Sequence, residues 1–157
     1  PANVDNRENL TRILNALNAI SKDIKIIFPI HPRTVKNAEA FGLKHLIESN
    51  QIILCEPQGY LDFMKLISSA KGVVTDSGGI QEETTFRQIP CITLRPNTER
   101  PSTIELGSNV LMDFDLTALK DKIAQIENGT FKKGTIPPMW DGKATERIFE
   151  VLNKIIT

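Results

Sequence analysis

The stretch from Val73 to Glu83, Val-Val-Thr-Asp-Ser-Gly-Gly-Ile-Gln-Glu-Glu, predicts a buried strand, a tight turn and the start of a helix. At such a turn, backbone N–H groups and the positive end of the helix dipole face one point, which suits a phosphate or diphosphate. Glycines let a ligand approach the backbone closely. We therefore expect Ser77, Gly78 and Gly79 to cradle phosphate oxygens and Glu83 to accept hydrogen bonds from sugar hydroxyls. The alternative is a purely structural turn in which Ser77 caps the helix.

Size and composition describe an ordinary globular protein. The chain has 157 residues, of which 40% are hydrophobic and 24% are charged, and its 19 basic and 19 acidic residues balance to a net charge of zero. A neutral balance argues against nucleic acid as a partner and against a polybasic membrane patch. No apolar run approaches the roughly 20 residues that span a bilayer. We expect no membrane association and a cytoplasmic location.

Helical and strand patterns alternate along the chain. Helices are expected at 9–20, 35–47 (irregular at Gly42), 60–70, 79–87, 102–106, 116–126 and 144–156, and strands at 24–30, 52–54, 72–75, 91–94 and 109–112. The residues expected to face inward on the third helix are Leu61, Phe63, Met64, Leu66 and Ile67. Strands without period-two alternation predict a parallel sheet covered on both faces, which is the doubly wound, Rossmann-like α/β fold class.

Polar residues follow several of these strands. His31, Gln58, Asp76–Gly79 and Arg95–Arg100 each come just after a predicted strand. Ligands of doubly wound sheets bind beyond the carboxyl ends of the strands. We therefore expect these segments to converge on one binding edge.

Four motifs, in order along the chain, resemble one family. They are Glu56-Pro-Gln-Gly-Tyr-Leu-Asp-Phe63, Thr75-Asp-Ser-Gly-Gly-Ile-Gln-Glu-Glu83, Thr98-Glu-Arg-Pro101 and Trp140-Asp-Gly-Lys-Ala-Thr-Glu-Arg-Ile148. The chain resembles the non-hydrolysing UDP-N-acetylglucosamine 2-epimerases over essentially its whole length. Ser102-Thr103 departs from the Glu-Ala that follows Thr-Glu-Arg-Pro in one branch of that family.

The resemblance implies roles for individual residues. Ser77, Gly78 and Gly79 contact the nucleotide diphosphate, and Glu83 holds the ribose hydroxyls, whereas Glu82 is expected to be a solvated helix residue. Arg100 offsets the diphosphate charge, its alternative being a surface ion pair with Glu99 or Glu105.

Three further residues match family positions. Gln58 and Phe63 match positions around the uracil, with a loop residue and a core ring as their alternatives. His31 falls in the interdomain cleft, where the family binds substrate or a second, regulatory UDP-GlcNAc. Trp140 is expected to anchor the last helix, and the thiols of Cys55 and Cys91 are expected to be buried and free.

The implied parent is a GT-B-type two-domain isomerase, of which residues 1–157 match the C-terminal half as a single UDP-sugar-binding domain. UDP-GlcNAc and UDP are the expected ligands, with the missing N-terminal domain and a homodimer of the parent as partners and with no cofactor and no metal. The family eliminates UDP to a 2-acetamidoglucal and adds it back on the other face, giving UDP-ManNAc. Since the proton-transfer carboxylates belong to the N-terminal half, no catalytic residue is assigned here and the chain alone is expected to be inactive.

Other functions are compatible with the same motifs. The chain could be the UDP-binding half of a GT-B glycosyltransferase, which would release UDP only with an acceptor, or a non-catalytic UDP-sugar-binding module. A hydrolysing relative that releases free ManNAc is a further alternative. The Thr98–Pro101 and Trp140–Ile148 motifs favour the epimerase.

Overall fold

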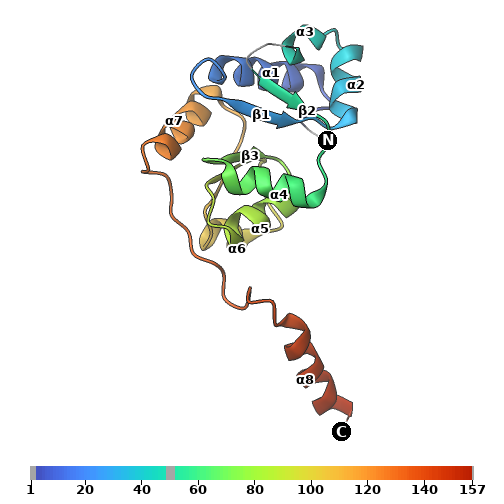
Figure 1. The fold of residues 1–157 in the computed structure, drawn as a ribbon, viewed down its shortest axis with the longest axis vertical. Coiled ribbons are helices and arrows are strands. Elements are labelled where there is room, and N and C mark those ends of the chain that lie inside the picture. The colour runs from blue at the N-terminus through green and yellow to red at the C-terminus, as the bar shows by residue number, and fades with distance from the viewer. Residues whose placement is uncertain (1–2, 49–51, 157) are drawn as a thin grey trace. The chain divides into compact units, whose positions relative to one another are not determined.

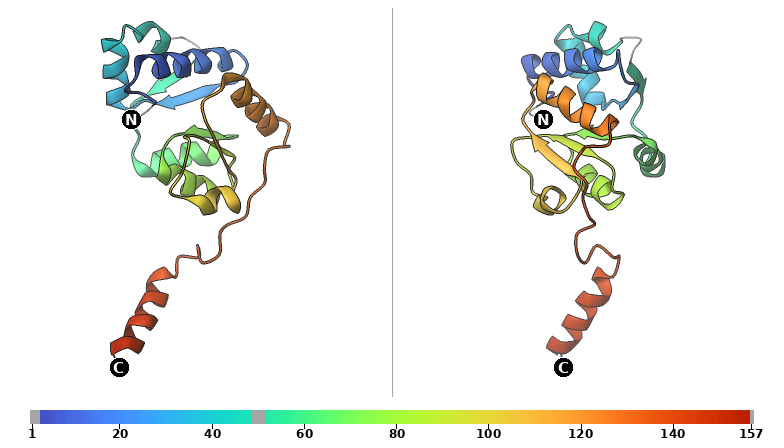
Figure 2. Two further views of the ribbon diagram at one scale, coloured as in Figure 1. Left: turned by 180° about the vertical axis from the view of Figure 1, so that it is seen from behind. Right: turned by 90° about the vertical axis from the view of Figure 1, so that its left-hand side faces the viewer.

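The computed structural model describes residues 3–48 and 52–156, which form two compact units (Figures 1 and 2). The first unit runs to Lys65 and the second begins at Leu66. Each unit has its own parallel sheet, so the predicted alternation of helices and parallel strands is confirmed. The two units are described in turn.

The first unit consists of two parallel strands and three helices. Its elements are α1 (Arg7–Ile20), β1 (Ile26–Pro29), α2 (Pro32–Ala40), α3 (Lys44–Ile47) and β2 (Ile52–Cys55). Strand β1 pairs with β2 in the register Ile26 to Ile52. The side chain of Asn6 accepts a hydrogen bond from the Asn9 N–H at 3.1 Å and so caps the start of α1.

Apolar faces of the three helices enclose the core of this unit, and Figure 1 shows the helices gathered over the β1–β2 pair. The buried core residues are Leu10, Leu14, Ile30, Ala38, Leu43 and Ile47. The single helix predicted for 35–47 is wrong, because the chain breaks into α2 and α3 at Gly42. Gly42 has φ +73°, a left-handed conformation that ends a helix and that glycine adopts without steric cost.

The second unit is built on a three-stranded parallel sheet in the order β3-β4-β5. Its elements are β3 (Val73–Thr75), α5 (Gly78–Phe86), β4 (Cys91–Leu94), α6 (Pro101–Glu105), β5 (Asn109–Met112), α7 (Leu116–Glu127) and α8 (Ala144–Ile156). Helix α4 (Tyr60–Ser69) spans the boundary between the units. Val73 pairs with Cys91, and Cys91 pairs with Asn109. The carboxyl ends of β3 and β4 therefore lie side by side.

Strand β4 is the centre of this sheet, and all four of its residues are buried. Burial raises the pKa of the Cys91 thiol, which keeps this thiol protonated and unreactive. Both cysteines are free as predicted, but Cys55 is only half-buried. Helix α5 contacts β3, β4 and β5, so the start of α5 is fixed relative to the strand ends.

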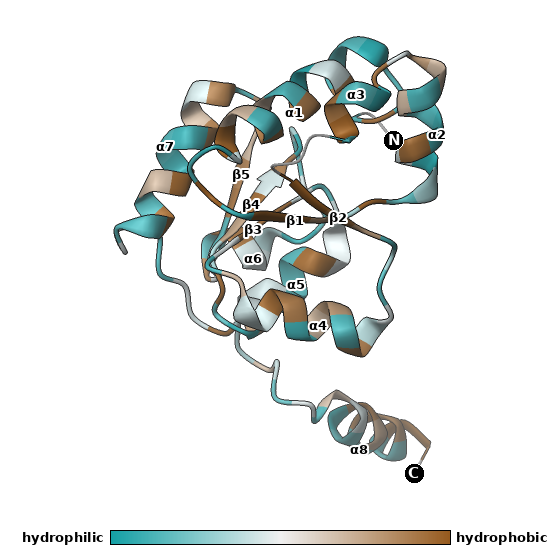
Figure 3. Ribbon diagram, turned by 45° about the horizontal axis from the view of Figure 1, so that its top comes forward, coloured by the Kyte–Doolittle hydropathy of each residue, from teal (hydrophilic) through white to brown (hydrophobic). Residues whose placement is uncertain are grey.

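Helices α4 and α8 both contain apolar residues, coloured brown in Figure 3, and both expose some of them to solvent. Met64 and Ile67 of α4 are buried as predicted, but the prediction for Leu61 is wrong because it is 80% exposed. Leu61 lies in the first turn of α4, which contributes no buried residue. Helix α8 buries none of its residues. None of the helices in the described part of the chain combines the length and hydropathy needed to cross a bilayer.

Removing an unpaired hydroxyl from α5 should stabilise the fold. Thr85 is fully buried, and its Oγ1 has no hydrogen-bond partner among the described residues. Substitution Thr85→Val should raise the free energy of unfolding by about 1 kcal/mol, because a buried unpaired hydroxyl is destabilising. The matched control is Thr84→Val, which removes an equally buried hydroxyl that donates to the Ile80 carbonyl at 2.8 Å. Urea unfolding should show the opposite sign for Thr84→Val, and a loss of stability in Thr85→Val would contradict this account.

Candidate functional site

The start of α5 presents backbone N–H groups at the carboxyl end of β3. Ser77 is the N-cap residue, with the extended backbone angles φ −87° and ψ 129°, and the helix begins at Gly78. Ser77 and Gly79 are exposed, and the Ser77 side chain makes no capping hydrogen bond to the described residues. The N–H groups of the first turn therefore face outward with the positive end of the helix dipole, an arrangement that binds anions.

Gly78 and Gly79 differ in what surrounds them. A Cβ on Gly79 would meet open space, whereas a Cβ on Gly78 would overlap the Oε1 atom of Glu99. The Glu99 carboxylate therefore lies against the start of the helix, in space that a side chain at position 78 would share. The other Glu99 oxygen accepts a hydrogen bond from Nη1 of Arg95 at 3.0 Å. The pKa of Glu99 is lowered, first by a hydrogen bond with its own backbone and further by Arg95, so Glu99 is ionised at neutral pH.

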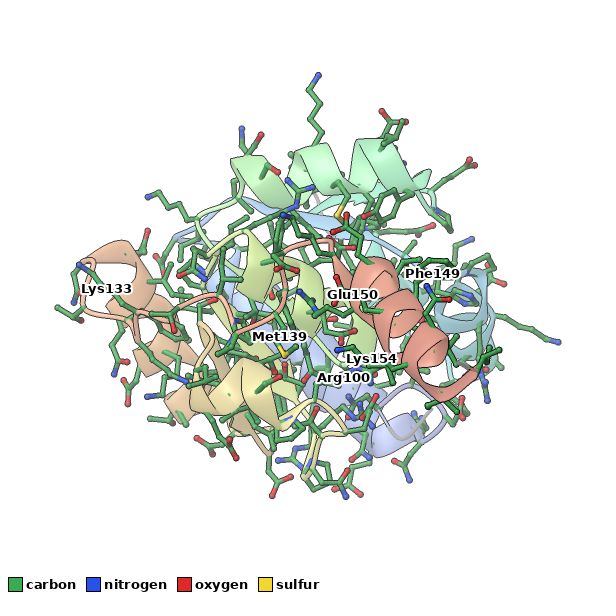
Figure 4. All side chains as sticks on the ribbon, turned by 90° about the horizontal axis from the view of Figure 1, so that it is seen from below. Arg100, Lys133, Met139, Phe149, Glu150 and Lys154 are labelled. Carbon is green, nitrogen blue, oxygen red and sulfur yellow. The ribbon has the colours of Figure 1, made fainter. Side chains whose placement is uncertain are left out.

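Arg100 lies beside α5, and Figure 4 labels it among the side chains of the chain. Its Nε is 3.2 Å from Oε2 of Glu82, without the alignment of a hydrogen bond. The ion-pair partner of Arg100 is therefore Glu82, and the prediction of Glu99 or Glu105 as its partner is wrong. Glu82, which was expected to be a solvated helix residue, is only partly solvated. The two side chains are 42% and 41% exposed, so this pair adds little to stability. The ion pair places the guanidinium beside Glu82, about one helical turn after the start of α5.

Glu83 is half-buried and lines a cavity of about 310 Å³. Glu82, Phe86 and Trp140 complete the lining. The cavity combines carboxylates with two aromatic rings, which suits a ligand that carries hydroxyls and an apolar face. Phe86 was missed in the sequence, although it follows Glu83 by three residues and so shares its side of the helix. Trp140 was interpreted as an anchor of the last helix and instead lines this cavity.

The Trp140–Ile148 motif forms a turn that leads into α8. Both guanidinium Nη atoms of Arg147 donate to the Asp141 carboxylate at 2.9 Å, and one also donates to the Met139 carbonyl at 2.9 Å. The Lys143 N–H donates to the same carboxylate at 3.0 Å. The Asp141–Arg147 pair thus fixes the entry of α8, as a bidentate guanidinium–carboxylate pair does.

Three candidate residues belong to the first unit or to α4. His31 is the N-cap of α2, and its Nδ1 accepts from the Arg33 N–H at 3.1 Å. The amide of Gln58 donates to the Glu56 carbonyl at 2.6 Å, and Phe63 is half-buried on α4. His31 and Gln58 follow β1 and β2, which are paired, so both lie beyond the same edge of the two-stranded sheet. Their roles toward a ligand stay predictions.

Sequence reasoning also missed a buried amide. Gln81 is fully buried within the motif that predicted the site, and Asn109 on β5 is fully buried as well. Gln81 shares a helix face with Thr84 and Thr85, at the three- and four-residue spacing that marks one side of a helix. Polar residues on the side of a helix that packs on the sheet, where apolar residues are usual, are the sequence signal that could have indicated a buried amide. Among residues 3–48 and 52–156, no group of three or more His, Cys, Asp or Glu side chains could hold a metal ion.

Comparison with known proteins identifies the family. The family model described as UDP-N-acetylglucosamine 2-epimerase matches residues 1–153. The chain belongs to the UDP-N-acetylglucosamine 2-epimerase family. Its α/β fold corresponds to the C-terminal part of the GT-B-type structures of these epimerases, as expected from the sequence.

Two relatives illustrate the match. The UDP-N-acetylglucosamine 2-epimerase of Methanocaldococcus jannaschii is 42% identical over 153 residues, which are 96% of this chain and 41% of that protein. Its crystal structure in complex with UDP-GlcNAc and UDP has a TM-score of 0.85, with 98% of this chain and 42% of that chain covered at 40% identity. The enzyme of Methanococcus maripaludis is 48% identical over 116 residues, 72% of this chain and 32% of that protein. The chain spans between one third and about two fifths of the length of these relatives.

The Asp141–Arg147 pair should be visible in an acid titration. The pKa of Asp141 is lowered from 3.8 to about 2, first by the hydrogen bond from Arg147 and then by the Lys143 N–H. Because the folded-state pKa is the lower one, the pair stabilises the turn fully above the ordinary pKa and is lost as the pH falls through about 2. Carbon-detected NMR of the Asp141 carboxylate should give this midpoint, and Arg147→Met should return it toward the ordinary value. An unchanged midpoint in the variant would contradict the assignment.

Proposed function

We propose that this chain is the nucleotide-binding portion of an enzyme that reversibly inverts C2 of UDP-GlcNAc to give UDP-ManNAc. The observation that carries the proposal is the outward-facing N-terminus of α5, with Arg100 held beside it, in a chain of the 2-epimerase family. First-turn N–H groups and a guanidinium are groups that bind phosphate oxygens. The M. jannaschii relative, whose structure contains UDP-GlcNAc and UDP, supports the same class of ligand.

In this proposal, different residues of the second unit bind different parts of the nucleotide. The Ser77 hydroxyl and the N–H groups of Gly78 and Gly79 hold the diphosphate, while the Ser77 N–H donates to the Thr75 hydroxyl at 3.0 Å. Arg100 offsets the diphosphate charge. Glu83 accepts hydrogen bonds from both ribose hydroxyls, which an ionised carboxylate does well. The position of Glu83 on the wall of a cavity, about one helical turn from the phosphate-binding end, supports this arrangement.

We assign the remaining nucleotide contacts to residues from the first unit and α4. Gln58 reads the uracil edge and Phe63 covers its face, while His31 contributes to a cleft for substrate or a second UDP-GlcNAc. In this proposal residues 1–157 act as one UDP-sugar-binding domain. It works with a catalytic N-terminal half, in a cytoplasmic homodimer, without a cofactor. The matching order of all four motifs along the chain is what supports these assignments.

The proposed reaction is an elimination followed by an addition. Removal of the C2 proton and departure of UDP from C1 leave 2-acetamidoglucal, and UDP then returns to C1 while C2 is protonated on the opposite face. The diphosphate gains charge as it departs, and the N–H groups of α5 with Arg100 would stabilise that charge. A residue outside this chain moves the C2 proton. The chain alone therefore binds UDP without turnover, and formation of UDP-ManNAc by the isolated chain would overturn this division of labour.

Removal of the Glu83 carboxylate should abolish most of the UDP binding. Isothermal titration of the chain with UDP should give a dissociation constant in the micromolar-to-millimolar range. In Glu83→Ala the affinity should fall at least about tenfold, because two charge-assisted hydrogen bonds to the ribose are lost.

The control variant is Asp121→Ala, which removes an exposed carboxylate from α7 of the same unit. It should retain the affinity of the wild type, so that a general effect of net charge is excluded. Equal UDP binding by Glu83→Ala and the wild type would contradict the proposed ribose contact.

A further inference from the structure

A pair of buried amides lies beneath the segment that carries Arg100. Gln81 on α5 and Asn109 on β5 are both fully buried, and Nδ2 of Asn109 donates to Oε1 of Gln81 at 3.2 Å. Asn109 is held in turn by Thr93 on β4, whose hydroxyl donates to Oδ1 of Asn109 at 2.7 Å. This chain of hydrogen bonds connects the central strands of the sheet to the helix that begins at Gly78.

Each amide also reaches one hydroxyl on the Arg100 segment. The Thr98 hydroxyl donates to Oε1 of Gln81 at 2.7 Å, and Nδ2 of Asn109 donates to the Thr103 hydroxyl at 3.2 Å. These two hydroxyls hold the backbone of Arg100 from both sides. The Arg100 N–H donates to Thr98 at 3.1 Å, and the Thr103 hydroxyl donates to the Arg100 carbonyl at 2.7 Å. Both backbone polar groups of Arg100 are thus connected to the buried amides.

The directions of these bonds leave little freedom. Because the Thr98 oxygen accepts the Arg100 N–H, its single proton is available for Gln81. Because the Thr103 proton goes to the Arg100 carbonyl, its oxygen accepts from Asn109. The orientation of the Asn109 amide is set by the proton that Oδ1 receives from Thr93. A buried network in which the hydroxyl protons and the Asn109 amide have fixed partners is rigid and specifies one geometry.

One atom of the network is not satisfied. Nε2 of Gln81 is buried without a hydrogen-bond partner among the described residues. An apolar side chain of similar size would avoid this unpaired donor. The amide is therefore a poor choice for stability alone, and its use of Oε1 as a double acceptor indicates a role in fixing Thr98.

We infer that Gln81, Asn109 and Thr98 are positioning residues that hold Arg100 at a set place relative to the N-terminus of α5. The inference rests on the proposed function, in which Arg100 and the first turn of α5 bind one diphosphate. Gln81 lies three residues after Gly78 on the same helix, so the network ties the backbone of Arg100 to the helix that supplies the N–H groups. The ligand contact most sensitive to the network is accordingly the diphosphate and not the nucleoside.

The test removes one hydroxyl from the network. Thr98→Val deletes the group that joins the Arg100 N–H to Gln81, and Thr98→Ser keeps it. The affinities of the full 157-residue chain for UDP and for uridine are measured by ¹⁵N NMR titration. Thr98→Val should weaken UDP binding about tenfold and leave uridine binding within about twofold, because misplacing a charged group costs the diphosphate contact only. Thr98→Ser should restore the UDP affinity.

A double-mutant cycle separates positioning from a general effect on folding. If Thr98 acts through Arg100, adding Thr98→Val to Arg100→Ala should cause no further loss of UDP affinity. Thr84→Val is the structural control, since its hydroxyl bonds within α5 and not to the Arg100 segment. It should alter thermal stability and keep the ratio of UDP to uridine affinity. If Thr98→Val does not fold, Thr103→Val removes the bond on the other side of Arg100 and is held to the same criteria.

The outcomes distinguish the inference from the function on which it rests. Additive losses in the cycle, or equal losses for UDP and uridine, would overturn the positioning role. If Arg100→Ala binds UDP more weakly than the wild type while Thr98→Val binds UDP equally well, the inference is overturned and the proposed function stands. An Arg100→Ala variant that binds UDP as the wild type does would overturn both.

Discussion

The hydrogen bond between the buried amides of Gln81 and Asn109 is the interaction on which the geometry of the candidate site depends. It joins α5 to β5, and through Thr98 and Thr103 it holds the backbone of Arg100. Buried amides are tolerated only when they are hydrogen-bonded, so these groups constrain one another more strictly than apolar side chains would. The fold thereby holds the backbone of Arg100 against the helix that begins at Gly78, which limits the ordering that binding requires.

The charged side chains around this site form ion pairs that can be broken with little loss of folding free energy. Arg100 pairs with Glu82, and Arg95 pairs with Glu99, whose carboxylate lies against the start of α5. These side chains are between 30% and 51% exposed, and exposed ion pairs contribute little to stability. An anion bound at the N-terminus of α5 can therefore replace a carboxylate as the ion-pair partner of Arg95 or Arg100 without a large loss of folding free energy. The buried amides keep the backbone around Arg100 rigid, and the exposed ion pairs allow the two arginines to exchange a carboxylate for a bound anion.

Much of this fold could be predicted from the sequence because local patterns decided it. Strand β5 was predicted with its observed bounds, and the helix predicted to start at Gly79 begins one residue earlier, at Gly78. Errors arose where tertiary contacts decide. Leu61 has the helical spacing of a core residue but lies on a turn of α4 that buries nothing. The pairing of Arg100 with Glu82, and the cavity shared by Glu83 and Trp140, join residues that no sequence spacing connects.

A crystal structure of the chain with UDP would test the central claim most directly. The account predicts diphosphate oxygens within hydrogen-bonding distance of the Ser77 hydroxyl and of the Gly78 and Gly79 N–H groups. The Arg100 guanidinium should contact the same oxygens, and the ribose hydroxyls should contact Glu83. The bonds from Thr98 and Thr103 to the Arg100 backbone should be unchanged. A diphosphate bound away from the N-terminus of α5, or an Arg100 segment rearranged with those two bonds broken, would contradict it.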